Sequence, residues 1–133
     1  MLKTVYVTAC LCLLPLSAMA DPVGLYDVKG TNVDTGEEYT GAVEVTRTGS
    51  TYALAWKIGD LEFYGTGIGM HLEGSNLIVG PATENEIGIS VTYSLENTPT
   101  LGLYLQQPDG TLNGVWTEAG SQKTSPESWT RVR

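Results

Sequence analysis

The tripeptide Asp34-Thr35-Gly36 is the first group in this 133-residue chain whose residue types could do chemistry. It matches the tripeptide of aspartic proteases, in which two carboxylates share one proton. Such an enzyme also needs a far larger cleft, made by two lobes or two chains. Because Asp and Gly favour tight turns, we interpret the surrounding stretch NVDTGEEY as a hairpin turn.

His71 is the only histidine, and Glu73 follows it two residues later. In a strand both side chains point to the same side of the sheet. One histidine and one carboxylate supply at most half of a metal site. A Ser-His-Asp triad would depend on the same histidine, and no Gly-x-Ser-x-Gly motif is present. We therefore expect His71 to be a solvated surface residue, and we expect no metal site.

Residues 32–38 place oxygen-bearing side chains at alternating positions, which faintly resembles a calcium loop. The segment lacks the spacing and the later bidentate glutamate of such a loop. The sequence also contains no phosphate-binding loop and no dinucleotide fingerprint. These observations predict a non-enzymatic protein without a cofactor. A carboxylate-based hydrolase stays as an alternative, because 15 acidic residues permit one although no spacing supports it.

Aromatic residues are the remaining candidates for a binding site. Small eight-stranded barrels either fill their interior with such side chains or hold one small ligand there. The sequence leaves open whether the aromatic residues fill the interior or line a pocket. The residues that we expect to face the interior and to contact any ligand are Tyr52, Trp56, Phe63, Trp116 and Trp129.

The elements that position these residues show apolar and polar side chains alternating with a period of two. In the stretch 51–58 the large apolar residues occupy every second position, and in the stretch 100–106 Leu101, Leu103 and Leu105 alternate with Gly102 and Tyr104. A period of two is typical of strands with one buried face. No stretch shows the helical period over three turns, so we expect no substantial helix.

Turn-forming residues separate the alternating stretches at short intervals. They predict antiparallel strands joined by hairpins, at residues 23–30, 39–47, 50–58, 61–69, 75–80, 86–94, 100–107, 110–118 and 127–132. Closing a sheet removes its exposed edges. The sequence therefore predicts an all-β fold, a small antiparallel up-and-down β-barrel of about eight strands, with a β-sandwich as the alternative.

Three glycines fall at similar places within the predicted strands. Gly41, Gly65 and Gly114 each follow a large apolar residue by two positions, in EYTGAV, FYGTGI and TLNGVW. A glycine inside a strand often marks a bend or a close approach of two backbones. This similar placement fits a repeated barrel element, although chance similarity among glycine-rich strands also explains it.

The composition excludes several function classes. Cys10 and Cys12 both lie in the first twenty residues, so residues 21–133 contain no disulfide, thiol enzyme or zinc–thiolate site. Residues 21–133 keep all 15 acidic and six of the seven basic residues, for a formal net charge of −9. Such a charge repels nucleic acid and anionic lipid. The residues expected on the polar faces, which do not suit a membrane-spanning barrel, are Glu44, Arg47, Lys57, Glu62 and Glu86.

Residues 1–20 have the pattern of a secretory signal peptide. Lys3 precedes an apolar run from Val5 to Leu16, and a small-x-small pattern ends at Ala20. The run is shorter than the ~20 residues that span a bilayer. We expect cleavage after Ala20, export to the periplasm or the extracellular space, and one β-barrel domain at residues 21–133 with no transmembrane span.

Six stretches, which together cover nearly all of residues 21–133, resemble a family of small exported bacterial proteins. They are GLYDVKGTN, YTGAVEVTRTGSTYALAWKIG, YGTGIG, LIVG, GLYLQQPDGTLNGVWTEAG and ESWT. Members of this family often carry the name fibronectin-binding protein. The resemblance implies adhesion to an extracellular protein and implies no catalytic residues. More loosely, the rhythm of strand, glycine and tryptophan is similar to that of avidin-like and lipocalin-like barrels, in architecture only.

The sequence therefore predicts an exported, non-enzymatic binding protein. The expected partner is fibronectin or another matrix-type extracellular protein, bound through the outer surface or the loops. The alternative is a carrier that holds a small apolar molecule inside the barrel.

Overall fold

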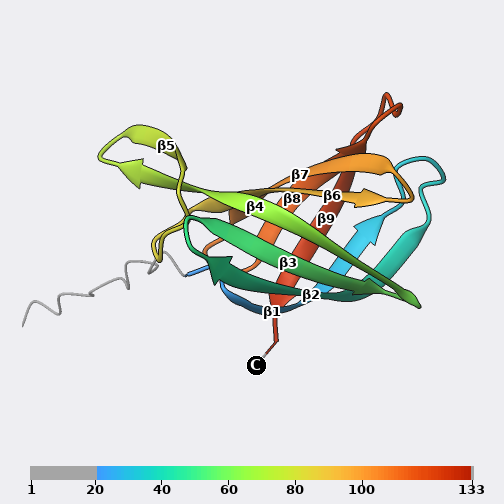
Figure 1. Ribbon diagram of the computed structural model, residues 1–133, viewed down its shortest axis with the longest axis horizontal. Helices are drawn as coiled ribbons and strands as arrows, with labels where there is room; N and C mark the ends of the chain where they lie inside the picture. Colours follow the sequence, from blue (N-terminus) through green and yellow to red (C-terminus); the bar gives the residue numbers. More distant parts are fainter. Residues whose placement is uncertain (1–20, 133) are drawn as a thin grey trace, which may run out of the picture.

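Nine antiparallel strands form within residues 21–132, the part of the chain that the computed structural model describes. They are β1 (Gly24–Thr31), β2 (Glu38–Thr48), β3 (Thr51–Ile58), β4 (Leu61–Glu73), β5 (Asn76–Gly80), β6 (Gly88–Leu95), β7 (Thr98–Gln106), β8 (Leu112–Glu118) and β9 (Ser125–Arg131). Eight of them close a barrel in the order β1-β2-β3-β4-β6-β7-β8-β9, with β9 paired to β1 (Figure 1). The predicted all-β barrel is confirmed. The predicted signal peptide, residues 1–20, lies outside the described residues.

β5 is the strand that lies outside the barrel. The edge of β4 that pairs with β3 as far as Gly67 pairs with β5 from Gly69 to Glu73. The other edge of β4 pairs with β6, so the barrel passes from β4 to β6 directly. The β4–β5 hairpin consequently projects beyond the neighbouring strands (Figure 1). Among the described residues no helix forms, and so none is long and apolar enough to cross a membrane.

Large side chains fill the centre of the barrel. Trp129 is fully buried, and its ring centroid lies 4.1 Å from that of Tyr104, 6.0 Å from that of Tyr26 and 6.1 Å from that of Trp56. Aromatic side chains bury the largest apolar areas and dominate the energetics of a protein core. Residues 21–133 contain no cysteine, so no disulfide adds to this stabilisation. The buried core consists of Tyr26, Val28, Val43, Val45, Tyr52, Leu54, Trp56, Phe63, Ile89, Val91, Tyr104, Leu112 and Trp129.

The three strand glycines mark close approaches of neighbouring backbones, as the sequence predicts. A Cβ at Gly65 would lie 2.3 Å from the carbonyl oxygen of Thr92, on β6. The corresponding distances are 2.3 Å from Gly41 to the Lys57 carbonyl and 2.1 Å from Gly114 to the Leu103 carbonyl. A side chain has no room at these points, so glycine lets the barrel wall curve tightly there.

The buried face of β7 is the one that carries Tyr104, not the one that carries the leucines. Leu101, Leu103 and Leu105 are 56%, 42% and 45% exposed on the outside of the barrel. The Tyr104 hydroxyl donates a hydrogen bond to a buried carboxylate, Glu127, at 2.8 Å. Because successive strand residues point to opposite faces, the inward position of Tyr104 places the three leucines outside.

One end of the barrel, beside the β4–β5 hairpin, is closed by residues 81–87. The Tyr52 hydroxyl donates to the Thr83 carbonyl at 2.9 Å, and Arg47 donates to the same carbonyl and pairs with Asp21 at 2.7 Å. Glu86 is buried, and its carboxylate accepts hydrogen bonds from the backbone and hydroxyl groups of Thr83 at 2.6 and 2.8 Å. The expectation that Glu86 lies on an outward polar face is therefore wrong.

His71 is partly buried at this closed end, whereas the sequence predicts a solvated residue. Its Nδ1 atom lies 3.9 Å from the Glu86 carboxylate, and its Nε2 atom lies 3.5 Å from Glu73. A Cβ at Gly69 would lie 2.3 Å from the Glu86 carboxyl carbon. The missing side chain at Gly69 thus lets Glu86 lie against β4 and face His71.

Candidate functional site

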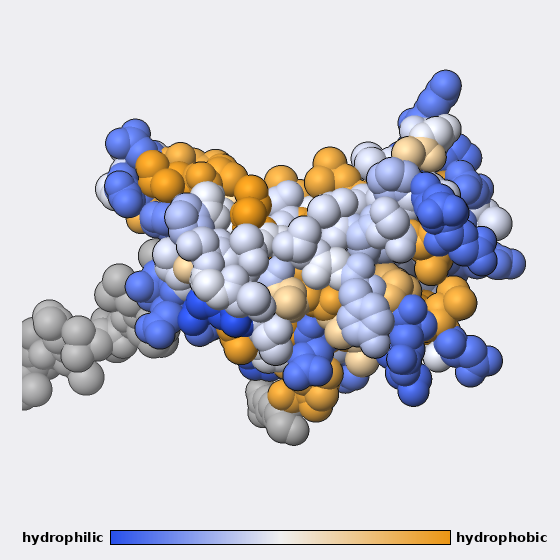
Figure 2. All heavy atoms as spheres, in the orientation of Figure 1, coloured by the Kyte–Doolittle hydropathy of each residue, from blue (hydrophilic) through white to orange (hydrophobic). Residues whose placement is uncertain are grey.

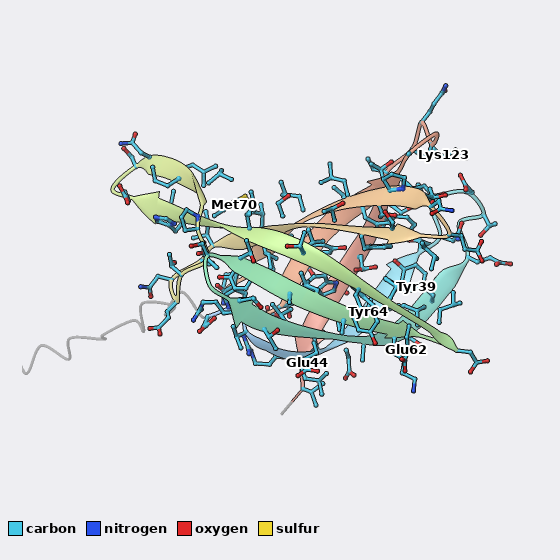
Figure 3. All side chains as sticks on the ribbon, in the orientation of Figure 1. Tyr39, Glu44, Glu62, Tyr64, Met70 and Lys123 are labelled. Carbon is cyan, nitrogen blue, oxygen red and sulfur yellow. The ribbon has the colours of Figure 1, made fainter. Side chains whose placement is uncertain are left out.

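The other end of the barrel, which we call the mouth, contains a cavity of about 140 Å³. The connections at this end are residues 32–37, 59–60, 96–97 and 119–124. Figure 3 shows Tyr39, Glu62 and Lys123 at this end and Met70 near the opposite one. The residues that line the mouth cavity are Asn32, Tyr39, Trp56, Ile58, Leu61, Phe63, Tyr93, Leu95, Trp116 and Glu127.

Aromatic rings form most of the wall of the mouth cavity. Trp56 and Phe63 face each other in the β3–β4 ladder and stack with ring centroids 5.4 Å apart. Tyr93, on β6, packs against both rings, at 4.9 Å from Trp56 and 4.6 Å from Phe63. Tyr39 and Trp116 meet edge to face at 6.5 Å. We call these five residues the aromatic cup.

Glu127 lies beneath the aromatic cup. The alternation of β9 turns Ser125, Glu127 and Trp129 inward, and Glu127 is 8% exposed. One carboxylate oxygen accepts hydrogen bonds from the Tyr104 hydroxyl at 2.8 Å and the Trp129 indole N–H at 2.6 Å. The Tyr39 hydroxyl donates to the other oxygen. Three donors aimed at one carboxyl group match the acceptor-only, ionised form.

No ion pair among the described residues involves Glu127. Buried charges in proteins are normally paired with an opposite charge or coordinate a metal. The Glu127 charge is instead held by three neutral donors. The carboxylate is thus satisfied in its hydrogen bonds while its charge lacks a counter-charge within residues 21–132.

The tyrosines around Glu127 are held in their protonated form. Burial raises the pKa of Tyr39 above its ordinary value, and the negative charge of Glu127 raises it further. The same two causes, in the same order, raise the pKa of Tyr93 to about 12 and that of Tyr104 well above its ordinary value. At neutral pH these hydroxyls therefore remain hydrogen-bond donors and their rings remain uncharged.

Trp116 has a buried indole N–H that makes no hydrogen bond to any described residue. It lies close enough to the Tyr39 hydroxyl to lower the pKa of that group slightly against the larger raising effects. A buried donor without an acceptor is uncommon in folded proteins.

Acidic side chains surround the mouth. Lys29 and Lys57 pair at 4.0 and 3.9 Å with Glu38 and Glu62, and all four side chains are exposed. Burial and the neighbouring Asp34 raise the pKa of Glu118. Figure 2 shows hydrophilic side chains gathered at this end of the molecule. The acidic residues on or next to the mouth connections are Asp34, Glu37, Glu38, Asp60, Glu62, Glu96 and Glu118.

The structure brings together three of the five predicted site residues. Trp56, Phe63 and Trp116 line the mouth cavity. Trp129 lies in the filled core and is connected to the site by its hydrogen bond to Glu127 and its ring contact with Trp56. Tyr52 lies at the closed end of the barrel, bonded to Thr83.

Sequence reasoning missed Tyr39, Tyr93 and Glu127 as site residues. Glu127 precedes Trp129 by two positions, so the period of two already places both on the same face of one strand. This shared strand face is the feature of the sequence that indicates an inward position for Glu127. Tyr39 and Tyr93 depend on which strands meet at the mouth, which the sequence pattern does not specify.

The other sequence motifs form local structure. The Asn32 side chain accepts hydrogen bonds from the backbone N–H groups of Asp34 and Thr35 at 2.9 and 3.0 Å, and Gly36 has a φ of 74°. These features make residues 32–37 the turn between β1 and β2, as predicted. Within residues 21–132, no group of three His, Cys, Asp or Glu side chains is arranged to hold a metal ion.

Comparisons with known proteins identify the architecture. No protein-family model matches the chain, and no curated protein matches it. A redesigned beta barrel matches with a TM-score of 0.56 and 14% sequence identity, over 88% of this chain and 96% of that one. A de novo designed fluorescence-activating beta barrel matches with a TM-score of 0.53 and 15% identity, over 88% and 99%. At these identities the likeness describes the fold alone.

Proposed function

We propose that this protein is an exported, non-enzymatic binding protein that holds a small apolar or aromatic group in its mouth cavity. The observation that carries the proposal is the aromatic cup, which leaves a cavity at one end of a barrel whose centre is filled. Ligand sites in proteins are concave and lined mainly by apolar and aromatic side chains with a few polar groups. Here Glu127 and Tyr39 supply polar groups among the lining residues.

The size of the cavity limits the ligand. An apolar cavity of roughly 150 Å³ accepts a molecule the size of benzene, and the mouth cavity has about 140 Å³. The bound group is therefore about as large as one six-membered ring. A larger ligand would place one such group in the aromatic cup and leave the rest outside.

Calorimetric titration with benzyl alcohol tests this proposal. We expect saturable binding with a Kd on the order of 1 mM or below. A Kd of 1 mM corresponds to a binding free energy of roughly −4.1 kcal/mol. The variant Leu95→Trp fills the cavity from its partly buried wall and should lower the affinity at least tenfold. The matched control Leu101→Trp adds the same ring to the outer surface, where Leu101 is 56% exposed, and should bind as the wild type does. Absence of binding, or equal binding by both variants, would contradict the proposal.

The outer surface favours a second candidate function, the recognition of an extracellular protein. Aliphatic side chains lie side by side across the ladders from β5 to β8, with Ile68 and Leu103 on either side of Ser90, and Leu103 opposite Val115. Figure 2 shows apolar side chains on the β4–β5 hairpin and along the adjoining edge. We call the following residues, which are 40–56% exposed, the apolar outer face: Ile68, Leu72, Leu77, Val79, Leu101, Leu103, Leu105 and Val115.

Contiguous exposed apolar patches of this kind mark interaction sites in soluble proteins. The resemblance to exported proteins named as fibronectin-binding supplies a candidate partner. Saturable binding of residues 21–133 to immobilised fibronectin at micromolar concentration would support this candidate function. Leu103→Lys should then weaken the binding at least tenfold while Leu95→Trp leaves it unchanged. If no saturable binding occurs at that concentration, fibronectin is excluded as the partner.

A further inference from the structure

We propose that the group held in the mouth cavity is a small organic cation, an ammonium or quaternary ammonium attached to an apolar or aromatic body. This inference rests on the proposed ligand site and names the chemical class of its ligand. Three independent features of the mouth carry it. They are the charge of Glu127, the faces of the aromatic cup and the acidic rim.

The charge of Glu127 is the first feature. A group whose only task is to accept hydrogen bonds from Tyr39, Tyr104 and Trp129 does not need a charge, because a neutral amide or carbonyl oxygen accepts as well. An ionised carboxylate is far harder to remove from water than a neutral acceptor. Glu127 is 8% exposed, lines the mouth cavity and lacks a cationic partner within residues 21–132. A cation in the cavity would supply that partner.

The oxygen atoms of Glu127 leave room for this contact. The oxygen that faces Tyr104 and Trp129 already accepts two hydrogen bonds. The other oxygen accepts one, from Tyr39. A carboxylate oxygen accepts about two hydrogen bonds, so the oxygen beside Tyr39 retains one site for an ammonium N–H. A quaternary ammonium would interact with the same charge without a hydrogen bond.

The aromatic cup is the second feature. Aromatic rings carry a negative face, and a cation within about 6 Å of a ring centroid is attracted to it. Trp56, Phe63 and Tyr93 lie within 4.6–5.4 Å of one another, and Tyr39 and Trp116 add a second pair. The rings of Trp56, Phe63 and Tyr93 pack directly on one another, so a cation in the cavity would lie against the ring surfaces that line it and not between the rings. A cage of aromatic rings is a recurrent site for quaternary ammonium groups in proteins.

The acidic rim is the third feature. Seven acidic residues lie on or beside the connections that surround the mouth. Lys29 and Lys57 offset two of them, and Lys123, on the connection of residues 119–124, offsets a third, so acidic residues remain in excess. A cleft with an excess of charge of one sign around it raises the local concentration of a ligand of the opposite sign. The rim therefore attracts cations to the cavity and repels anions.

Three probes of nearly the same shape test the inference: benzylammonium, benzyl alcohol and benzoate, titrated calorimetrically at pH 7 and low salt. We expect benzylammonium to bind at least tenfold more tightly than benzyl alcohol, and benzoate at least tenfold more weakly. Glu127→Gln keeps the shape of the floor and removes its charge. It should lower the affinity for benzylammonium about tenfold and reduce the ratio of the benzylammonium affinity to the benzyl alcohol affinity.

The salt dependence of binding to the wild-type protein tests the inference even if Glu127→Gln does not fold. Raising the salt concentration from 20 to 500 mM screens the rim charges and should weaken benzylammonium severalfold while benzyl alcohol binds unchanged. Equal affinity for benzylammonium and benzyl alcohol, with no effect of salt, would overturn the cation inference and leave the mouth site standing. Failure of all three probes to bind would overturn the proposed ligand site as well.

Discussion

Gly65 shows how much of the barrel wall depends on one absent methyl group. A Cβ there would lie 2.3 Å from the Thr92 carbonyl oxygen and 2.9 Å from the Trp56 ring. Neither neighbour can move freely, since the first is backbone in the β4–β6 ladder and the second belongs to the core. The position therefore couples the closure of the sheet to the shape of the aromatic cup.

We expect Gly65→Ala to lower the free energy of unfolding by roughly 1–3 kcal/mol, the usual range for overpacking. The matched control is Gly80→Ala, at a strand end where an added Cβ would meet nothing within 4 Å. That control should change stability by less than about 0.5 kcal/mol. Urea unfolding followed by tryptophan fluorescence measures both. Equal stability of the two variants would show that the backbone and side chains around Gly65 can shift to accommodate a Cβ.

Single residues also show which parts of the site could be predicted from the sequence. The period of two places Trp56, Phe63 and Trp116 inside, because one strand fixes the face of each. The position of a residue along the barrel axis depends on the stagger of the closed sheet, which no single strand contains. Tyr52 and Trp56 share a face of β3 but end at opposite ends of the barrel.

The β4–β5 hairpin is the element that differs most from the rest of the fold. Barrel strands have partners on both edges, whereas β5 has a described partner on one edge, β4. Three of its five residues, Leu77, Val79 and Asn76, are exposed. Local opening of β5 therefore exposes little apolar surface and breaks few contacts.

Hydrogen exchange followed by mass spectrometry measures this difference. We expect the amides of Asn76–Gly80 to exchange at least 100-fold faster than those of β3 and β9 under native conditions. The comparison is internal, because all three strands are measured in one sample. Protection of β5 equal to that of β9 would mean that its free edge is covered in solution, for example by a second chain.

The strands as elements were predictable where their alternation is strong, and all nine occur close to their expected residues. Two features of arrangement were not. β4 continues to Glu73, since His71 and Leu72 prolong the alternation beyond the glycines, and this length lets it pair with three strands. β7 carries large apolar residues on one face and Tyr104 on the other, so the alternation of the sequence alone does not decide which face is buried. In the barrel Tyr104 points inward, where its hydroxyl donates a hydrogen bond to Glu127.

At the scale of the whole molecule the two ends and the outside of the barrel have different chemistry. The closed end is sealed by hydrogen bonds between residues 81–87 and the side chains of Tyr52 and Arg47. The mouth combines an aromatic cavity with acidic residues. The apolar outer face lies on the outside of the wall at β6, β7 and β8 and continues onto the β4–β5 hairpin. A small ligand and a protein partner would thus occupy separate surfaces and need not compete.

Buried tyrosines at both ends make the stability of the whole barrel sensitive to alkaline pH. Burial raises the pKa of Tyr52 and of Tyr93 to about 12 each, and it raises the pKa values of Tyr39 and Tyr104 as well. In the unfolded chain a tyrosine has a pKa near 10. Between these values the unfolded chain has lost protons that the folded barrel retains, so stability falls as the pH rises.

The contribution of Tyr93 alone, for a shift from about 10 to about 12, is a loss of about 1.4 kcal/mol by pH 11. Below pH 10 this contribution is fully present, and the other three tyrosines add to the loss in the same direction. Free energies of unfolding from urea titrations at pH 8, 10 and 11 measure the slope. Tyr93→Phe should show a shallower fall than the wild type, because phenylalanine has no proton to lose. A stability that stays constant from pH 8 to 11 would mean that the hydroxyls open to water without unfolding of the barrel.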